Sequence, residues 1–387
     1  MKNKLIGAAA LGLLLATSAT GQTRGVTANS IIIGSHTDLS GPLASWGVPA
    51  TNGARMRIDA VNAAGGIHGR QIDFRVEDTQ YQVPLTVRAT NRLVQRDNIF
   101  AMILGAGTAQ SMASMEITDR EGIPNVFPLT AARSMAHPIH PLHVSYFVSY
   151  QDQAVGALRH FHESEGISSV CLQTQSSEYG EEVTEGVRGA AEELGIEIKM
   201  IGTHRTTETE FAGVATAIRN ADCDMVYLGT TGRDTIGLYT TLRQLGYSGP
   251  MAGNMVSYLP VVAQAAGGAM EGLYVVSPVS NADFADGDPF RAEFLTAYRS
   301  AFGDEPTVQA QVGYASADLL VMALEAAGPD LTAEGLMAAI EEIRDYQDPF
   351  GGPQISFGAE KRFGGDSLIL LQVQNSAWVQ LQENLPF

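Results

Sequence analysis

This chain alternates short apolar runs with stretches of helical periodicity, a pattern typical of βαβ units built around parallel sheets. In a first set, the expected strands are 30–34, 71–78, 100–104 and 124–127, and the expected helices are 49–64, 84–96 and 109–121. In a second set, helices over 151–165, 178–194, 211–220 and 234–245 alternate with strands over 169–174, 197–203, 225–229, 250–253 and 273–277. Helices over 289–302, 308–327 and 332–343 follow, and two hairpin strands over 368–373 and 377–381 come last.

The two sets indicate two domains. The length of 387 residues agrees, because a domain usually contains about 100–200 residues. We therefore predict an α/β fold with two doubly wound parallel-sheet lobes. No Pro- or Ser-rich linker separates the sets, so short strand-like crossings must join them, and 144–149 and 273–279 are the candidates.

The charge balance argues against two classes of partner. Acidic residues number 42 against 24 basic ones, which gives a formal net charge of -18. A surface this negative repels phosphate backbones and anionic lipid headgroups. We therefore expect this chain to bind neither nucleic acid nor a membrane surface.

The N-terminal segment 1–21 has the pattern of a secretory signal peptide. Lys2 and Lys4 precede an apolar run over 5–16, and small residues follow up to Gly21. The run is about twelve residues long, against the ~20 that span a bilayer, so a permanent membrane anchor is not expected. Cleavage after Ala19 or after Gly21 fits equally well. The mature protein is expected to be exported and soluble.

Two cysteines, Cys171 and Cys223, lie at or beside expected strands of the second set. In an exported protein such a pair suggests a disulfide, provided that the two strands are neighbours. The alternative is two small buried apolar side chains.

Two further motifs resemble sites that bind cofactors or metals. Gly105–Gln110 follows a strand and opens a helix, but it lacks the third glycine of a dinucleotide fingerprint and follows the third strand, so no nucleotide cofactor is expected. Its helix N-terminus can still present free N–H groups to an anion or a carbonyl. His137, His140 and His143 recur every three residues, but intervening prolines disfavour a helix. In an extended segment they point in different directions, so we expect a solvated loop and no metal.

Catalytic motifs are missing from the sequence. It contains no Gly-x-Ser-x-Gly elbow, no His-Glu-x-x-His helix and no Walker loop. We therefore expect a protein that is not an enzyme and has no catalytic residue.

Segment 37–47 (TDLSGPLASWG), followed by 52–55 (NGAR) and 62–70 (NAAGGIHGR), resembles a known family. The similarity is to periplasmic leucine/isoleucine/valine-binding proteins, the type I solute-binding components of ABC importers. The resemblance implies two lobes joined by three crossing segments, with the ligand in the cleft between them. The lobes would be 28–147 with 279–352, and 148–278 with 353–387.

The resemblance also implies a set of ligand-binding residues. Trp46 would form a wall of the pocket; the alternative is a tryptophan that packs the core or the lobes together. Two turns would hold the polar groups of the ligand, one with Gly107 and Thr108 and the other with Leu129 and Thr130. The opposing lobe would contribute Tyr179 and, at two further positions, Thr231 and Asn254.

The residue at position 254 departs from the family pattern. Amino-acid binders carry a glutamate there for the ligand ammonium, whereas this chain has Asn254. A register one residue later would place Met255 there, which is not an acid either. A buried ammonium without a charged partner is very costly. We therefore predict a ligand without an α-ammonium group, such as a small carboxylate, aromatic acids included, or an amide.

The resemblance further implies a monomer in the periplasm that closes around a small organic ligand and docks on an ABC permease, with no cofactor. The ligand would be an amino acid by the family pattern, or one of the acids and amides that the change at position 254 favours. Two other functions remain as alternatives: a ligand-sensing receptor domain of the same fold and, more remotely, a secreted hydrolase.

Overall fold

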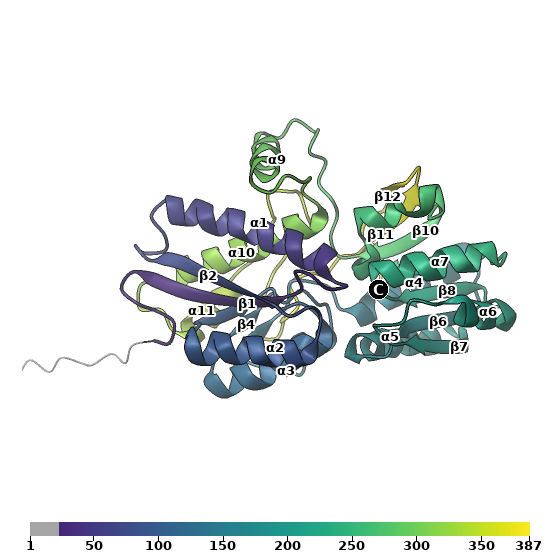
Figure 1. Cartoon of the computed structure of the whole chain (residues 1–387), viewed down its shortest axis with the longest axis horizontal. Coiled ribbons are helices and arrows are strands. Elements are labelled where there is room, and N and C mark those ends of the chain that lie inside the picture. Colours follow the sequence, from purple (N-terminus) through teal and green to yellow (C-terminus); the bar gives the residue numbers. More distant parts are fainter. Residues whose placement is uncertain (1–22) are drawn as a thin grey trace, which may run out of the picture.

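The computed structural model describes residues 23–387 and contains two sheets, each at the centre of one lobe (Figure 1). The predicted two-lobe α/β fold is thereby confirmed. The signal peptide predicted over 1–21 lies outside the described residues. Within them, no helix combines the length and the apolar character needed to cross a membrane.

The first lobe is built on five parallel strands. Their order across the sheet is β2 (Gln71–Asp78), β1 (Ser30–Thr37), β3 (Ala101–Ile103), β4 (Asn125–Val126) and β5 (His143–Val144). The helices of this lobe are α1 (Ala44–Ala63), α2 (Val83–Asn91), α3 (Thr108–Thr118), α9 (Pro289–Phe302), α10 (Val308–Ala327) and α11 (Ala333–Glu341). Helices α1 and α10 lie on one side of the sheet, and α2 and α3 lie on the other (Figure 1). The lobe is therefore assembled from two separate parts of the chain.

Two glycines allow α1 and α10 to pack closely. A Cβ atom at Gly53 would overlap with the carbonyl oxygen of Ala310, and one at Gly313 would overlap with that of Ala50. This contact fixes the later helices to the N-terminal part of the lobe.

The second lobe is built on seven strands. Their order is β12 (Ala377–Gln382), β11 (Ile369–Gln374), β10 (Leu273–Ser277), β9 (Met251–Asn254), β8 (Met225–Gly229), β6 (Ser169–Gln175) and β7 (Glu197–His204). The first two form the predicted hairpin and join the parallel strands through an antiparallel pairing of β11 with β10. The helices are α4 (Tyr150–Glu165), α5 (Glu178–Leu194), α6 (Ala212–Ala221), α7 (Gly232–Gln244) and α8 (Pro260–Ala263).

Helix α1 begins five residues before the predicted start at residue 49, so Pro49 lies inside the helix. The reason lies in the preceding loop, where the Asp38 carboxylate accepts backbone hydrogen bonds from Ser40, Gly41 and Leu43. A loop fixed in this way allows the helix to start at Ala44, and its first turn carries Trp46.

Three chain crossings connect the lobes. The first follows β5, the second follows β10, and the third precedes β11. The first and third lie together, because Ser145 N donates to Arg362 O and Gly364 N donates to Ser145 O. The ring of Phe357 packs against that of Phe127 in the first lobe, with the centroids 5.6 Å apart. The boundary at 352/353 stays a prediction, and these contacts favour a crossing about ten residues later.

The structure contains the disulfide between Cys171 and Cys223, with the two Cα atoms 5.7 Å apart. The bond forms because β6 and β8 are neighbours, the condition on which the prediction depended. The prediction for the histidine loop is wrong for two of its three residues. His140 and His143 do not point apart, since their ring centroids are 4.1 Å from each other.

Candidate functional site between the lobes

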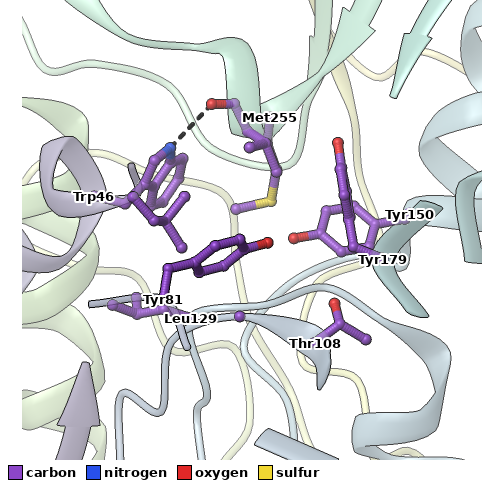
Figure 2. Close-up of a pocket in the computed structure, with 10 residues that line it drawn as sticks. Trp46, Tyr81, Thr108, Leu129, Tyr150, Tyr179 and Met255 are labelled. Atoms are coloured by element: carbon purple, nitrogen blue, oxygen red, sulfur yellow. Dashed lines mark hydrogen bonds between the residues drawn. The ribbon is translucent and has the colours of Figure 1, made fainter. Parts of the chain in front are cut away.

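A pocket lies where the two lobes face each other, and both contribute side chains to it (Figure 2). The first lobe provides Leu43, Trp46, Tyr81, Gly107, Thr108 and Leu129, and the second provides Tyr150, Tyr179, Met255 and Val256. Most of these residues follow the carboxyl ends of parallel strands, where α/β sheets generally bind ligands. The cavity is small, with about 20 Å³ of space for the centre of a water molecule, so it holds little more than one water.

Trp46 forms a wall of the pocket and also joins the lobes. Its side chain is only 3% exposed, and its indole Nε1 donates a hydrogen bond of 3.1 Å to the carbonyl oxygen of Val256. Its ring also meets Phe147 edge to face, with centroids 6.5 Å apart. Trp46 therefore both lines the pocket and holds the two lobes together.

The turn that begins α3 contributes Gly107 and Thr108 to the pocket lining. Gly107 is the N-cap of α3 and has φ of 89°, a conformation that glycine adopts without strain. A Cβ atom at this position would lie 2.7 Å from the Tyr81 ring, so glycine also allows that close approach. The first N–H groups of a helix have no partner within the helix and favour an anion or a carbonyl oxygen.

Thr108 presents a hydroxyl in the pocket, and a second threonine supports it. Its Oγ1 lies 2.8 Å from Oγ1 of Thr130, in a hydrogen bond that either hydroxyl can donate. Thr130 is buried behind Thr108 and does not line the cavity. Leu129 reaches the pocket beside them, because its segment pairs with Ala106 in an isolated bridge.

Two tyrosines come from the first turns of helices in the second lobe. Tyr150 starts α4 and Tyr179 lies near the start of α5, and their rings meet edge to face with centroids 5.0 Å apart. The Tyr179 hydroxyl donates to Oδ1 of Asn254 at 3.1 Å and accepts from its Nδ2 at 3.0 Å. These two hydrogen bonds with Asn254 fix the position of the Tyr179 hydroxyl.

The pocket contains no acidic or basic side chain among the residues that line it. Its hydroxyl groups come from Thr108 and from three tyrosines, of which Tyr150 and Tyr179 are buried and Tyr81 is partly buried. Burial raises the pKa of Tyr150 to about 12 and raises the pKa values of Tyr81 and Tyr179 further. The phenols therefore stay protonated and are able both to donate and to accept hydrogen bonds.

Five of the eight predicted ligand-binding residues line this pocket: Trp46, Gly107, Thr108, Leu129 and Tyr179. The other three predicted residues do not line the pocket. Thr130 and Asn254 form hydrogen bonds to the lining residues Thr108 and Tyr179. The Thr231 hydroxyl donates a hydrogen bond of 3.0 Å to the Asp234 carboxylate. Met255, the alternative residue for the position of Asn254, does line the pocket.

Sequence reasoning missed four lining residues: Leu43, Tyr81, Tyr150 and Val256. A signal existed for two of them. Tyr81 follows the carboxyl end of β2, and Tyr150 follows the helix-capping Ser149 after β5. Both positions belong to the strand ends at which ligands bind in this fold class.

Comparison with known proteins gives one family and a consistent set of relatives. The sequence model of the family described as "Periplasmic binding protein" matches residues 30–377. The leucine-, isoleucine-, valine-, threonine- and alanine-binding protein of Pseudomonas aeruginosa is 21% identical over 316 residues, 81% of this chain and 83% of that protein. The leucine-specific-binding protein of Salmonella typhimurium is 22% identical over 309 residues, 78% of this chain and 80% of that protein.

Solved structures share the fold. A fatty acid ABC transporter substrate-binding protein from Thermomonospora curvata superposes with a TM-score of 0.83 at 21% identity, covering 95% of this chain and 94% of that chain. A solute-binding protein of an ABC transporter from R. palustris, in complex with benzoate, superposes with a TM-score of 0.80 at 20% identity, covering 92% and 97%.

Proposed function

Because this chain belongs to the periplasmic binding protein family, we propose that it captures a small organic ligand between its lobes and delivers it to an ABC permease. The observation that carries the proposal is the pocket itself, to which both lobes contribute side chains. A ligand that contacts both lobes stabilises the closed arrangement over the open one, and only such differential contacts shift that balance. The permease then recognises the closed form of a monomeric carrier in the periplasm.

We propose that the ligand is a small aromatic or apolar carboxylate, or the corresponding amide, without an ammonium group. The lining offers no carboxylate to an ammonium, and an unpaired buried charge is strongly unfavourable. A ligand carboxylate would instead meet the N-terminus of α3, the Thr108 hydroxyl and the tyrosine hydroxyls. The aromatic rings of Trp46 and Tyr81 suit an apolar or aromatic body. The benzoate complex in the same fold illustrates such a ligand.

The cavity is too small to admit the proposed ligand without movement of the protein. About 20 Å³ of space does not accommodate an organic acid, so entry requires the lobes to separate or lining side chains to move. We expect the radius of gyration in solution scattering to change when the correct ligand is added. An unchanged radius at saturation would count against capture by lobe motion.

A thermal-shift screen followed by calorimetry tests the ligand class. Benzoate, phenylacetate, benzamide and leucine form a minimal panel that separates an acid, an amide and an amino acid. Binding at a hundredfold excess over Kd adds about 2.7 kcal/mol to the free energy of unfolding, which is readily visible in Tm. Leucine binding at micromolar Kd or tighter, about -8 kcal/mol, would overturn the prediction of an ammonium-free ligand.

A further inference from the structure

We propose that Asp119, His140 and His143 form a binding site for a divalent transition-metal ion at the end of α3 that lies away from the pocket. One ligating atom from each of the three residues lies within 4.8 Å of the other two. The site is independent of the proposed function, because the 11 residues of α3 separate it from Thr108 by about 16 Å.

Two separate pieces of the chain bring these side chains together. Asp119 begins the short 3-10 turn after α3, whereas His140 lies in the loop directly before β5 and His143 begins that strand. His143 Nε2 lies 2.7 Å from Oδ1 of Asp119, and the His140 ring lies 4.1 Å from the His143 ring, centroid to centroid. The prolines of the loop therefore prevent a helix but still leave two imidazoles side by side.

The ligand chemistry indicates the class of metal. Two imidazole nitrogens and one carboxylate oxygen suit Zn²⁺ and its neighbours in the first transition row, whereas Mg²⁺ and Ca²⁺ prefer oxygen ligands. Zinc bonds of about 2.0–2.2 Å in a tetrahedral arrangement place ligand atoms roughly 3.4 Å apart. The 2.7 Å contact between His143 and Asp119 would thus open by a little over half an ångström. A water molecule would complete the coordination.

A basic side chain beside the site would repel a bound cation. Arg362 is the basic side chain that acts on His140, but it forms an ion pair of 2.6 Å with Glu341. The cation therefore has its own counterion, and its repulsion of a bound metal ion is reduced.

Zinc titration of the full chain, purified without a histidine tag, tests the site. We expect one Zn²⁺ per chain by calorimetry, with Co²⁺ giving the visible absorption of a low-coordinate site. His140→Gln and Asp119→Asn should each weaken zinc binding by about tenfold or more, the scale of effect seen when supporting groups of metal sites are removed. His160→Gln is the matched control, because it removes a histidine from α4 in the other lobe.

Three results would overturn the proposal: no stoichiometric zinc, unchanged affinity in both site variants, or an equal loss in His160→Gln. The two site variants change side chains that are partly exposed, whereas His143 is buried. Circular dichroism of each variant separates lost binding from lost folding. Ligand affinity in the cleft provides a second reading, since the metal variants should leave it unchanged.

Discussion

The indole Nε1 of Trp46 donates a hydrogen bond of 3.1 Å to the carbonyl oxygen of Val256, and this bond crosses from one lobe to the other. It is one of several such links. Ser134 N donates to Glu182 at 3.1 Å, and the Gln309 amide donates to Tyr258 O at 2.7 Å. The protein's own polar contacts therefore hold the two lobes together.

Trp46→Phe removes the donor and retains an aromatic ring. Loss of one hydrogen bond costs about 1 kcal/mol, so we expect the closed form to lose roughly fivefold in population relative to the open form. Solution scattering of the free protein should show a larger radius. Trp378→Phe is the control, because the indole of Trp378 donates to Leu259 O at 2.8 Å within the second lobe. An equal increase of radius in both variants would contradict this role of Trp46.

The order of the fold follows from the sequence because the strand and helix periods are clear. The predicted helices 178–194, 289–302 and 308–327 coincide with α5, α9 and α10, and the predicted strand 225–229 coincides with β8. The start of α1 was less predictable. It depends on hydrogen bonds that backbone N–H groups of the loop donate to the Asp38 carboxylate, and these do not follow from local propensity.

The site was predictable only in part. The family pattern leads to Trp46, Thr108 and Tyr179, which line the pocket. It does not distinguish a lining residue from one directly behind it, because neighbouring positions after a strand differ only in side-chain direction. Asn254 and Met255 illustrate this: the first bonds to Tyr179, and the second faces the cavity.

Two buried tyrosines should respond differently to loss of the hydroxyl. Tyr179→Phe leaves Nδ2 of Asn254 without its partner, although Oδ1 still accepts from Val256 N, and should lower the free energy of unfolding by about 1–3 kcal/mol. The Tyr227 hydroxyl has no hydrogen-bond partner within the described part of the chain, so Tyr227→Phe should be neutral or stabilising. Urea unfolding of both variants provides the comparison. A similar destabilisation in both would contradict the assigned hydrogen bonding.

Removal of the disulfide should destabilise the second lobe. The bond joins residues separated by 52 positions, and chain-entropy reasoning for such a loop predicts a stabilisation of about 4 kcal/mol as an upper value. The double variant Cys171→Ala, Cys223→Ala should therefore unfold at lower urea concentration than the wild type. A reducing agent should shift the wild type toward the variant and leave the variant unchanged. A shift of the variant would indicate another cause.

The stability of the protein should fall as pH decreases from about 6.5 to about 4, in part because of His36. Burial lowers the pKa of this imidazole to about 4, below the value of about 6.5 expected in the unfolded chain. The unfolded state binds the proton more readily across this window, so acid favours unfolding by about 3 kcal/mol. His36→Asn should remove this part of the slope, measured by urea unfolding at several pH values. An identical slope in both proteins would contradict the contribution of His36.

Thr108 and Thr130 allow the ligand contact to be separated from the support of the turn. Thr108→Val and Thr130→Val break the same hydrogen bond, so each should cost about 1 kcal/mol of stability. Thr130→Val should cost somewhat more, because it also removes a hydrogen bond with Tyr150. Only Thr108 lines the pocket, and under the proposed function its hydroxyl would donate to a ligand carboxylate. Hydrogen bonds to charged groups contribute about 1.5–3 kcal/mol, so calorimetry should show carboxylate affinity reduced about tenfold or more in Thr108→Val and much less in Thr130→Val. Equal losses of affinity would mean that the hydroxyl pair acts by holding the turn, and that the ligand does not contact Thr108.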